Sequence, residues 1–346
     1  SIMPEITVAV TTHNLERYIC TCVEEILGQT FSSFEILIYD DCSTDRTRAL
    51  LAELQAEFPA QIRVICGEAP LKSPAKARNA ILDSGLIKGK YIVFLDGDDR
   101  IEENFLEKLY AAAQKEQADI ALCAYDRFEE GTGHVLCEEM RGFPAVISFP
   151  PERGLAAFIN GSLWNKLISV ECIGPTRLPL FSAGEDLSFL LALYDKCRRI
   201  ACVDEALIHY RVRESSVISN IQEETVHQFA WELLRLRATT AQPWLKDTLE
   251  LVAFIHIGIS MPLQQSRCRH FRSAAVGLRL LSAEFLLVSR TAAAATAGTA
   301  PIRRKGSRVM GGKNLLSGAL LSSVSVVIPD SHTEAAYRYK ILNRAI

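Results

Sequence analysis

Hydrophobic positions in the first hundred or so residues alternate between two spacings. Short runs rich in β-branched and aromatic residues predict buried strands at 6–11, 35–39, 61–66 and 91–95. Apolar residues that recur every three to four positions predict helices at 17–27, from a cap at Ser43 or Thr44 to 58, at 75–87 and at 102–117. Strands that alternate with helices predict an α/β fold, with a mostly parallel sheet covered by helices on both faces.

The pattern becomes less regular after residue 118 and then mainly helical. Strand-like runs occur at 119–124 and 200–210, and helical spacing at 152–159 and 185–194. Further helices are expected at 223–239, 244–261 and 270–289, and an Ala/Thr/Gly linker at 292–300. We therefore expect a catalytic domain over 1–218 and a mainly helical region over 219–346.

Polar clusters follow three of the predicted strands. His13 and Asn14 follow the first, Asp40 and Asp41 end the second, and the acidic run Asp-Gly-Asp-Asp at 96–99 follows the fourth. In open α/β sheets, ligands bind beyond the carboxyl ends of the strands. The three clusters are thus expected to converge on one edge of the sheet.

The acidic run at 96–99 has a metal-binding composition. Three carboxylates at the end of a buried strand repel one another and lose hydration, and a divalent cation relieves both costs. Mg²⁺ and Mn²⁺ take oxygen ligands and are commonly held by one or two carboxylates plus substrate phosphates. The alternative is an acidic turn in which Asp98 or Asp99 caps the next helix. On the first interpretation, the chain handles a phosphorylated substrate with a metal.

Composition excludes several classes of protein. A net charge of −3 over 346 residues gives no general attraction to nucleic acid. No run of about 20 apolar residues predicts a membrane span, and no signal peptide is expected because a strand begins near residue 6. The ten cysteines are scattered without a C-x-x-C pair, so a zinc site is not expected. Their scatter is typical of a protein in the reducing cytoplasm.

A basic segment stands out near the end of the chain. No acidic residue occurs between Glu284 and Asp330, whereas six Lys and Arg residues do, and an uncharged stretch at 315–328 follows them. This segment, 290–328, suits docking to anionic lipids at the inner face of the plasma membrane. The alternative is a solvated linker followed by a helix that forms a homo-oligomer.

Eight short motifs follow one another along the chain. They are T-T-H-N-L-E-R-Y-I at 11–19, Q-T-F with F-E-I at 29–36, D-D-C-S-T-D at 40–45, A-R-N at 77–79, D-G-D-D at 96–99, W-N-K-L at 164–167, G-E-D-L-S-F at 184–189, and Y-R-V-R with a serine at 210–216. In this order they resemble the inverting family 2 glycosyltransferases of the GT-A fold, over about residues 4–218. The resemblance implies a Rossmann-like, mixed but mostly parallel sheet.

The resemblance also implies where a nucleotide sugar would bind. The residues implied to contact it are Thr12, Asn14, Glu16, Asp41, Arg78, Asp96, Gly97 and Asp98. Asp41 would meet the base, usually uracil, and Arg78 the donor, while Asp96 and Asp98 would hold the metal and Asp99 would orient the turn. The alternatives are an Asx turn at residues 40–41, a solvated helix start at Glu16, and a structural salt bridge from Arg78 to Asp41 or Asp96.

The remaining motifs supply the acceptor side and further contacts. By resemblance, Asp186 is the general base, with a helix start that favours its ionised form and weakens it as a base. The alternative is that Glu185 and Asp186 are an N-cap pair for the helix at 187–194. Glu185 would hold the acceptor, and Trp164 would form an acceptor platform or pack in the core. The remaining candidates are His209 as a metal ligand or core histidine, and Arg211 and Arg213 as diphosphate contacts or a solvated strand face.

Some positions depart from the family's usual motifs. Thr11 stands where Pro is usual, His13 where an aromatic residue is common, and Ile81 where Gly usually follows A-R-N. Cys42 replaces the Gly of D-D-G-S, so the turn there is expected not to need a conformation reserved for glycine. Every carboxylate of the proposed site is retained.

The sequence thus predicts a glycosyltransferase that uses Mn²⁺ or Mg²⁺. It would move a sugar from a UDP-sugar, with inversion, to a saccharide or lipid-linked saccharide acceptor, in the synthesis of bacterial cell-surface polysaccharide. One alternative is a sugar-nucleotide nucleotidyltransferase, although residues 11–14 lack the Gly-rich loop of that class. The other is a non-catalytic saccharide-binding or scaffold protein, against which the retained Asp98 and Asp186 argue.

Overall fold

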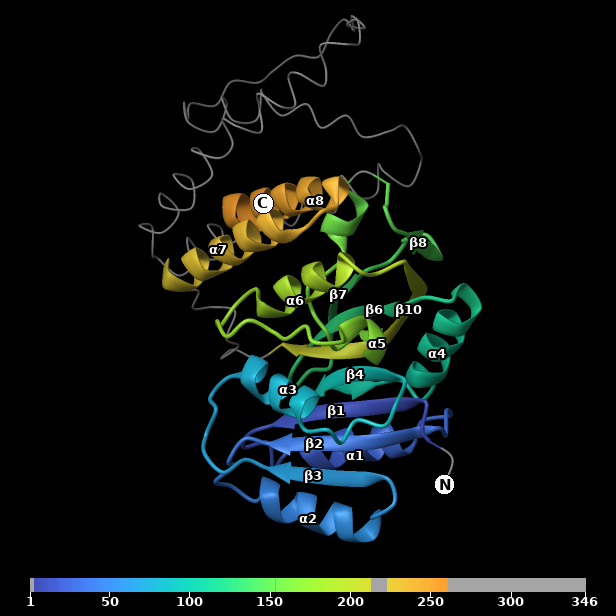
Figure 1. The fold of residues 1–346 in the computed structure, drawn as a ribbon. Helices are drawn as coiled ribbons and strands as arrows, with labels where there is room; N and C mark the ends of the chain where they lie inside the picture. Colours follow the sequence, from blue (N-terminus) through green and yellow to red (C-terminus); the bar gives the residue numbers. More distant parts are fainter. Residues whose placement is uncertain (1–2, 153, 213–222, 261–346) are drawn as a thin grey trace, which may run out of the picture. The chain divides into compact units, whose positions relative to one another are not determined.

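A computed structural model describes residues 3–152, 154–212 and 223–260 (Figure 1). All of these fall in one compact unit, Ser1–Gly277. The predictions for Arg213, for the helix at 270–289, for the linker at 292–300 and for the basic segment 290–328 lie outside the described residues.

The parallel half of the sheet carries the predicted strand–helix alternation. Its strands are β1 (Ile6–Thr12), β2 (Phe34–Asp40), β3 (Ile62–Cys66) and β4 (Tyr91–Asp96), in the order β3-β2-β1-β4. All three pairings are parallel, and in Figure 1 their arrowheads point the same way. The carboxyl ends of these strands therefore meet at one edge of the sheet.

The sheet continues with antiparallel additions. Next to β4 lie β9 (Lys166–Ser169), β6 (Ile120–Glu129) and β10 (Arg199–Val212), followed by β5 (Arg100–Ile101), while β7 (Val135–Glu139) and β8 (Val146–Ser148) pair with β6 and β10. Strand β9 runs antiparallel to both of its neighbours, whereas β6 and β10 are parallel. The longer strand pairings are parallel. This mixed but mostly parallel sheet with helices confirms the predicted α/β fold class.

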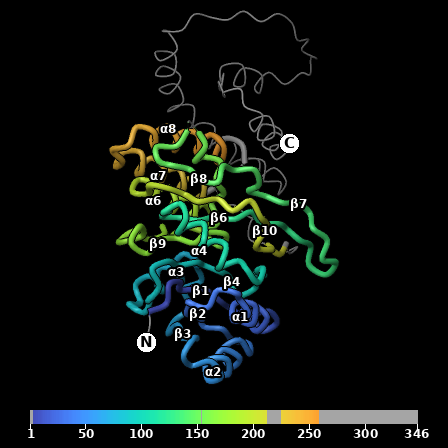
Figure 2. Tube along the Cα trace, turned by 90° about the vertical axis from the view of Figure 1, so that its right-hand side faces the viewer, coloured from blue at the N-terminus to red at the C-terminus, as the bar shows by residue number. Residues whose placement is uncertain are grey.

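Helices cover both faces of the parallel half. Along β1, Ile6, Val8 and Val10 enter one core with buried residues of α1 (Ile19–Leu27), α2 (Thr47–Glu57) and α4 (Phe105–Glu116). Helix α3 (Pro74–Asp83) packs on β1 and β2 and lies on the side away from α1 in Figure 2. The two-residue side-chain period of a strand assigns alternate residues to the two layers.

The later helices pack around α6 (Glu185–Tyr194), which follows the short α5 (Val170–Ile173). Helix α7 (Glu223–Thr239) contacts α6, and α8 (Pro243–Ala253) contacts both α7 and the 3-10 helix η1 (Leu155–Phe158). Because α6 is buried on nearly every side, its sequence is apolar all round. No helix within the described ranges has the length and apolar character needed to cross a membrane.

Two predicted helices differ from the structure. The one at 152–159 is only the four-residue 3-10 turn η1, because Gly154 has φ 79° and stops a regular helix from beginning earlier. The one at 244–261 is α-helical only to Ala253 and continues as a π-helix over Phe254–Ser260. The helix predicted at 223–239 is confirmed.

Candidate functional site

The three polar clusters meet at one edge, as predicted. Strand register places Thr12 beside Asp40 and Thr11 beside Asp96. The Thr11 hydroxyl donates to Asp96 Oδ1 at 3.2 Å, and the Asp41 amide donates to the Thr12 carbonyl at 2.9 Å. The ends of β1, β2 and β4 are thus tied directly together.

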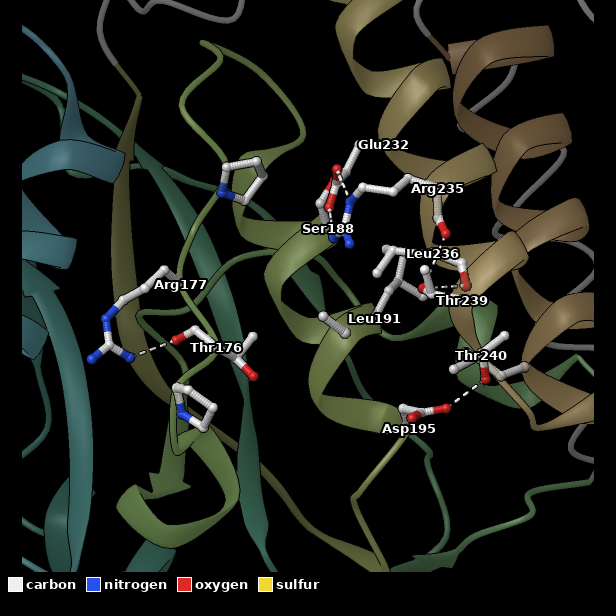
Figure 3. Close-up of a pocket in the computed structure, with 14 residues that line it drawn as sticks. Thr176, Arg177, Ser188, Leu191, Asp195, Glu232, Arg235, Leu236, Thr239 and Thr240 are labelled. Carbon is white, nitrogen blue, oxygen red and sulfur yellow. Dashed lines mark hydrogen bonds and ion pairs between the residues drawn. The ribbon is translucent and has the colours of Figure 1, made fainter.

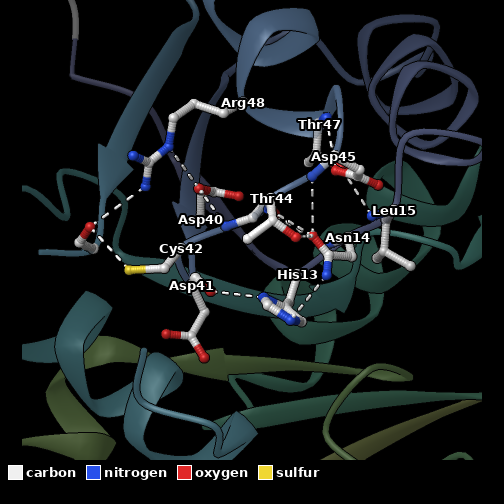
Figure 4. Close-up of polar contacts among 12 residues, drawn as sticks. His13, Asn14, Leu15, Asp40, Asp41, Cys42, Thr44, Asp45, Thr47 and Arg48 are labelled. Atoms are coloured by element: carbon white, nitrogen blue, oxygen red, sulfur yellow. Dashed lines mark hydrogen bonds and ion pairs between the residues drawn. The ribbon is translucent and has the colours of Figure 1, made fainter. Parts of the chain in front are cut away.

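Asn14 organises the first loop of this edge (Figure 4). It adopts a left-handed backbone conformation (φ 51°), which Asn tolerates better than most residues. Its side-chain oxygen accepts from the backbone amide of Thr44 at 2.7 Å, and its backbone amide donates to the Ser43 hydroxyl at 2.9 Å. His13 Nδ1 hydrogen-bonds the Asp41 carbonyl at 2.7 Å. This loop is therefore fastened to the start of α2.

Asp41 and Glu16 both brace backbone segments at the predicted base site. The Asp41 carboxylate accepts from the amides of Leu71 and Lys72 at 2.6 and 2.9 Å, and Glu16 accepts from the Arg46 amide at 2.9 Å. A carboxylate offers about four acceptor positions, so both retain capacity for a nucleoside.

The D-D-C-S turn differs from the expectation drawn from Cys42. This residue has φ 54°, so the turn does take the left-handed conformation that favours glycine. That conformation costs a non-glycine residue roughly 1–2 kcal/mol. The Cys42 thiol donates to the Gly67 carbonyl at 3.2 Å, and Asp40 makes the Asx-type contact by accepting from the Ser43 amide at 3.2 Å.

The carboxylates of the acidic turn after β4 have different roles. Asp99 is buried and accepts the Asp96 amide at 2.8 Å, so it orients the turn as expected. Burial, with Asp96 and Asp98 nearby, raises the pKa of Asp99 well above its ordinary value. A Cβ on Gly97 would lie 3.0 Å from Leu15 Cδ1, so a side chain is poorly tolerated there.

Asp96 and Asp98 are the other two carboxylates of this turn, and both are half-buried. The Asp96 side chain is 36% exposed at the carboxyl edge of the sheet. Within the described ranges, no group of three or more His, Cys, Asp or Glu residues has the arrangement of a metal centre. A cation held here would therefore draw most of its ligands from substrate oxygens and water, a common coordination pattern for Mg²⁺.

Arg78 links the edge of the sheet at Asp96 to the first turn of α6. It projects from α3, whose first turn is capped by Ser73. Its guanidinium is 5% exposed and contacts Asp96 Oδ1 at 3.1 Å and Asp186 Oδ1 at 2.7 Å. Although burial opposes the charge, Asp186, Asp96 and Glu185 raise the pKa of Arg78 above its ordinary value. The salt-bridge interpretation is thus correct for Asp96 but not for Asp41, and it adds Asp186.

Helix α6 presents Asp186 and Glu185 in its first turn. Gly184 precedes them with φ 92°, and a Cβ there would lie 2.7 Å from Phe229 Cδ2, so only glycine fits. Burial raises the pKa of Asp186, with Arg78 opposing the shift. Burial and the Asp186 charge raise the pKa of Glu185 to about 7. Desolvation therefore outweighs the expected effect of the helix dipole, and Asp186 is a stronger base than the sequence suggested.

Trp164 packs in the core, which decides between its two interpretations. It is 6% exposed and belongs to the central apolar cluster. Its ring meets Tyr125 edge-on at 4.5 Å between centroids and stacks on Tyr210 at 5.5 Å. The half-buried Tyr210 is the aromatic residue that Trp164 supports, and sequence reasoning gave it no role.

His209 and Arg211 of β10 already have partners. His209 Nδ1 lies 2.9 Å from Asp126 and Nε2 lies 2.8 Å from Glu102, so neither ring nitrogen is left for a metal. The Arg211 guanidinium lies 4.9 Å from the Tyr18 ring centroid and contacts Glu130 at 3.7 Å. In this arrangement both residues act as structural ties, which corrects the suggestion of a metal ligand for His209.

A separate cavity of about 380 Å³ lies between α6, α7 and the loop before α6 (Figure 3). Ser188, Leu191 and Asp195 contribute one face of α6, and Leu236 and Thr240 come from α7 and its end. Helical spacing places Ser188 about 200° from Asp186, on the other side of the helix. This cavity is therefore separate from the side of α6 that carries Asp186.

Replacing Ser188 by Ala is expected to stabilise the protein by about 1 kcal/mol. The Ser188 hydroxyl is buried and makes no hydrogen bond within the described structure, and such a group costs roughly 1–3 kcal/mol. Alanine also has the higher helix propensity. Urea unfolding would measure the change. Ser73→Ala is the matched control and should lose about 1 kcal/mol, because it removes the cap of α3. A loss of stability in Ser188→Ala would contradict the prediction.

Comparison with known proteins shows what this chain is similar to. The family described as Glycosyl transferase family 2 matches residues 7–152. Glycosyltransferase GlyA of Streptococcus pneumoniae is 29% identical over 232 residues, which are 64% of this chain and 33% of GlyA. The chain therefore spans about a third of the length of that relative.

Two solved structures share the fold. One is TarS residues 1–349 with UDP-GlcNAc, from Staphylococcus aureus, with a TM-score of 0.57, 22% identity and 72% and 70% of the two chains covered. TarS is named a poly(ribitol-phosphate) beta-N-acetylglucosaminyltransferase. The other is the mannosyltransferase PcManGT of Pyrobaculum calidifontis with GDP-Man and Mn²⁺, with a TM-score of 0.56, 15% identity and 86% and 81% covered.

Proposed function

We propose that this chain, whose residues 7–152 match the family described as Glycosyl transferase family 2, is such an enzyme and transfers a hexosyl group from a UDP-sugar to a saccharide or lipid-linked saccharide acceptor. Transfer inverts the anomeric carbon, and the product belongs to a bacterial cell-surface polysaccharide. The UDP-GlcNAc bound by TarS supports a uridine donor, whereas the GDP-Man bound by PcManGT indicates that the fold also accepts guanosine.

Asp96 and Asp98 are the proposed ligands of a Mn²⁺ or Mg²⁺ ion. The oxygen donors of this turn fit such a hard cation. Arg78 and Thr11 both contact Asp96 Oδ1, so Oδ2 is the oxygen available to a metal. The Thr12 hydroxyl is buried at the same edge without a hydrogen bond in the described structure and could meet a ligand. When bound, the cation would neutralise charge on the departing diphosphate. The Mn²⁺ complex of PcManGT supports this assignment.

One observation carries the proposed mechanism: a single guanidinium, that of Arg78, contacts both Asp96 and Asp186. In a single displacement, the leaving diphosphate and the attacking hydroxyl occupy opposite sides of the anomeric carbon. The donor edge at Asp96 and the base at Asp186 are close enough for the anomeric carbon to lie between them. Arg78 contacts Asp186 at Oδ1, so Oδ2 would receive the proton of the acceptor hydroxyl.

The acceptor would lie against the start of α6. Glu185, with a pKa raised by burial to about 7, can donate or accept a hydrogen bond to a sugar hydroxyl near neutral pH. The half-buried Tyr210 is the aromatic face we assign to the acceptor in place of Trp164.

The proposal keeps the division predicted from the sequence. It places catalysis in 1–218 and assigns 219–346 to a helical region. The protein would act in the cytoplasm, with segment 290–328 in contact with the inner membrane face or with a second copy of the chain.

A donor panel that follows UDP release in Mn²⁺ tests the proposed function. We expect Asp98→Asn to abolish the Mn²⁺-dependent part of UDP binding, because one of two metal ligands is lost. Calorimetric titration with UDP, with and without Mn²⁺, measures this. Asp204→Asn, which alters an exposed carboxylate, is the matched control and should bind normally.

Three outcomes would contradict the proposal. UDP binding that ignores Mn²⁺, without turnover on any donor, would favour the scaffold alternative. Synthesis of a sugar nucleotide from UTP and a sugar phosphate would favour a nucleotidyltransferase. Unchanged metal-dependent binding in Asp98→Asn would remove this residue from the metal site.

A further inference from the structure

Lys166 is a fully buried cation at the start of β9, and the proposed mechanism gives it no role. Its side chain is 0% exposed, and no ion pair within the described ranges includes it. Its Nζ lies 2.6–2.9 Å from four oxygens: the carbonyls of Asn160 and Ser162 and the side-chain oxygens of Asn160 and Asn165. Unpaired charges are rarely buried, because desolvation costs several kcal/mol.

The oxygens around Lys166 favour its charged form. A neutral amine has two protons to donate, whereas an ammonium has three, and four acceptors surround this nitrogen. Burial lowers the pKa of Lys166 to about 7, and the Asp186 charge opposes that shift. The four hydrogen-bond acceptors fit the charged form. In that form Nζ is a positive charge surrounded by oxygens, as a bound structural cation would be.

The Lys166 contacts fix the loop of residues 160–165. Asn165 is also fully buried and donates to the Cys123 carbonyl of β6 at 2.7 Å, which anchors one end of the loop to the sheet. At the other end, Gly161 lies directly on the first turn of α6. A Cβ on Gly161 would lie 2.7 Å from Leu187 Cβ, so the loop backbone and the helix are in close contact.

Leu187 follows the proposed base Asp186 in the chain. A shift of the 160–165 loop would therefore move the helix turn that carries this carboxylate. The charged groups acting on Asp186 are Arg78 and Lys166, which lower its pKa, and Asp96, which raises it. Lys166 is thus one of two cations that act on Asp186. It belongs to β9, whereas Arg78 belongs to α3.

We propose that Lys166 is a positioning residue for sugar transfer: its buried ammonium holds the 160–165 loop against the first turn of α6 and so fixes the carboxylate of Asp186. This inference rests on the proposed function, because it assigns Asp186 the role of base. Lys166 acts through the loop and its charge and does not touch the substrate.

Lys166→Met tests the proposal in the full chain, because it keeps the length of the side chain and removes the charge. We expect kcat to fall at least ~10-fold, while the affinity for UDP in Mn²⁺ changes less than ~2-fold. Loss of a positive charge near Asp186 raises the pKa of that carboxylate, so the acidic limb of the kcat–pH profile should move to higher pH by roughly half a unit or more. Lys90→Met, at a 72% exposed lysine, is the matched control and should leave both unchanged.

Gly161→Ala separates the effect of the loop position from the effect of the Lys166 charge. It also tests the proposal if Lys166→Met does not fold. It disturbs the contact with Leu187 but keeps the ammonium, so kcat should fall without a shift of the acidic limb. A folded Lys166→Met with unchanged kcat and pH profile would overturn the proposal. So would normal turnover by Gly161→Ala. Absence of UDP release by the unaltered chain would instead overturn the proposed function, and the two failures are thereby distinguished.

Discussion

The Asp186→Asn variant is expected to turn over at least ~100-fold more slowly than the unaltered chain while binding UDP with nearly unchanged affinity. A positioned general base contributes about 10²–10⁴-fold to the rate, and an amide cannot take the proton. The substitution keeps the shape of the side chain and an oxygen that Arg78 can contact in place of Oδ1. Steady-state UDP release gives kcat, and calorimetric titration gives the affinity for UDP.

The pH profile gives the same prediction a second readout. A base works only when deprotonated, so the rate falls as pH drops through its pKa. Burial raises the pKa of Asp186 above its ordinary value, which places the acidic limb at higher pH than a solvent-exposed Asp would. In Asp186→Asn this limb should vanish from whatever activity is left.

An exposed aspartate provides the control for this variant. Asp83 pairs with Arg177 at 2.8 Å and its side chain is 63% exposed. Asp83→Asn should therefore keep both kcat and the acidic limb. If Asp186→Asn turned over normally, the base would have to be sought elsewhere, and Glu185, with its pKa raised to about 7, would be the first residue to test.

The parallel half of the fold could be predicted from the sequence because its signals are local. Four apolar runs, each followed by a helical period, specify β1 to β4 and the helices between them. Short strands carry no such signal. Strand β5 has two residues and β8 has three, and both form only because β10 lies beside them. Pairings of this kind depend on distant parts of the chain, which hydrophobic spacing alone does not show.

The sequence selected candidate site residues but did not show their contacts. The resemblance selected Arg78, Asp96 and Asp186, yet Arg78 and Asp186 are 108 positions apart and their contact follows only from the folded chain. The pKa of the proposed base was also hidden, because a helix start suggests a lowered pKa for Asp186 whereas its burial has the larger and opposite effect. Burial depends on packing by other elements and cannot be read from a motif.

For side chains with two plausible roles, only the structure decides between the roles. Trp164 in the W-N-K-L motif could be a platform or core, and its contacts with Tyr125 and Tyr210 place it in the core. His209 could be a metal ligand or a core histidine, and Asp126 and Glu102 contact both of its nitrogens. A ring placed between two carboxylates is a tie between β10, β6 and the loop after β5. Residue type alone does not distinguish such a tie from a ligand.

Replacing Arg78 by Met is expected to lower both stability and turnover. The change removes a buried cation and leaves the carboxylates of Asp96 and Asp186 facing each other without it. Breaking a buried ion pair costs roughly 3–5 kcal/mol, and partial exposure of both carboxylates should reduce this to about 2–4 kcal/mol. Turnover should fall at least ~100-fold, because the donor edge and the base lose the group that links them. Urea unfolding and UDP release measure the two effects.

A double-mutant cycle separates the charge effect of Arg78 from simple loss of packing. In the Asp186→Asn background, Arg78→Met leaves one carboxylate without its partner instead of two, so it should cost at least about 1 kcal/mol less stability than in the unaltered chain. Arg177→Met, at a partly exposed arginine paired with the exposed Asp83, is the matched control and should lose under about 1 kcal/mol. Equal losses from Arg78→Met in both backgrounds would show that Arg78 and Asp186 are not energetically coupled, and the shared guanidinium would then not be what holds the two halves of the site together.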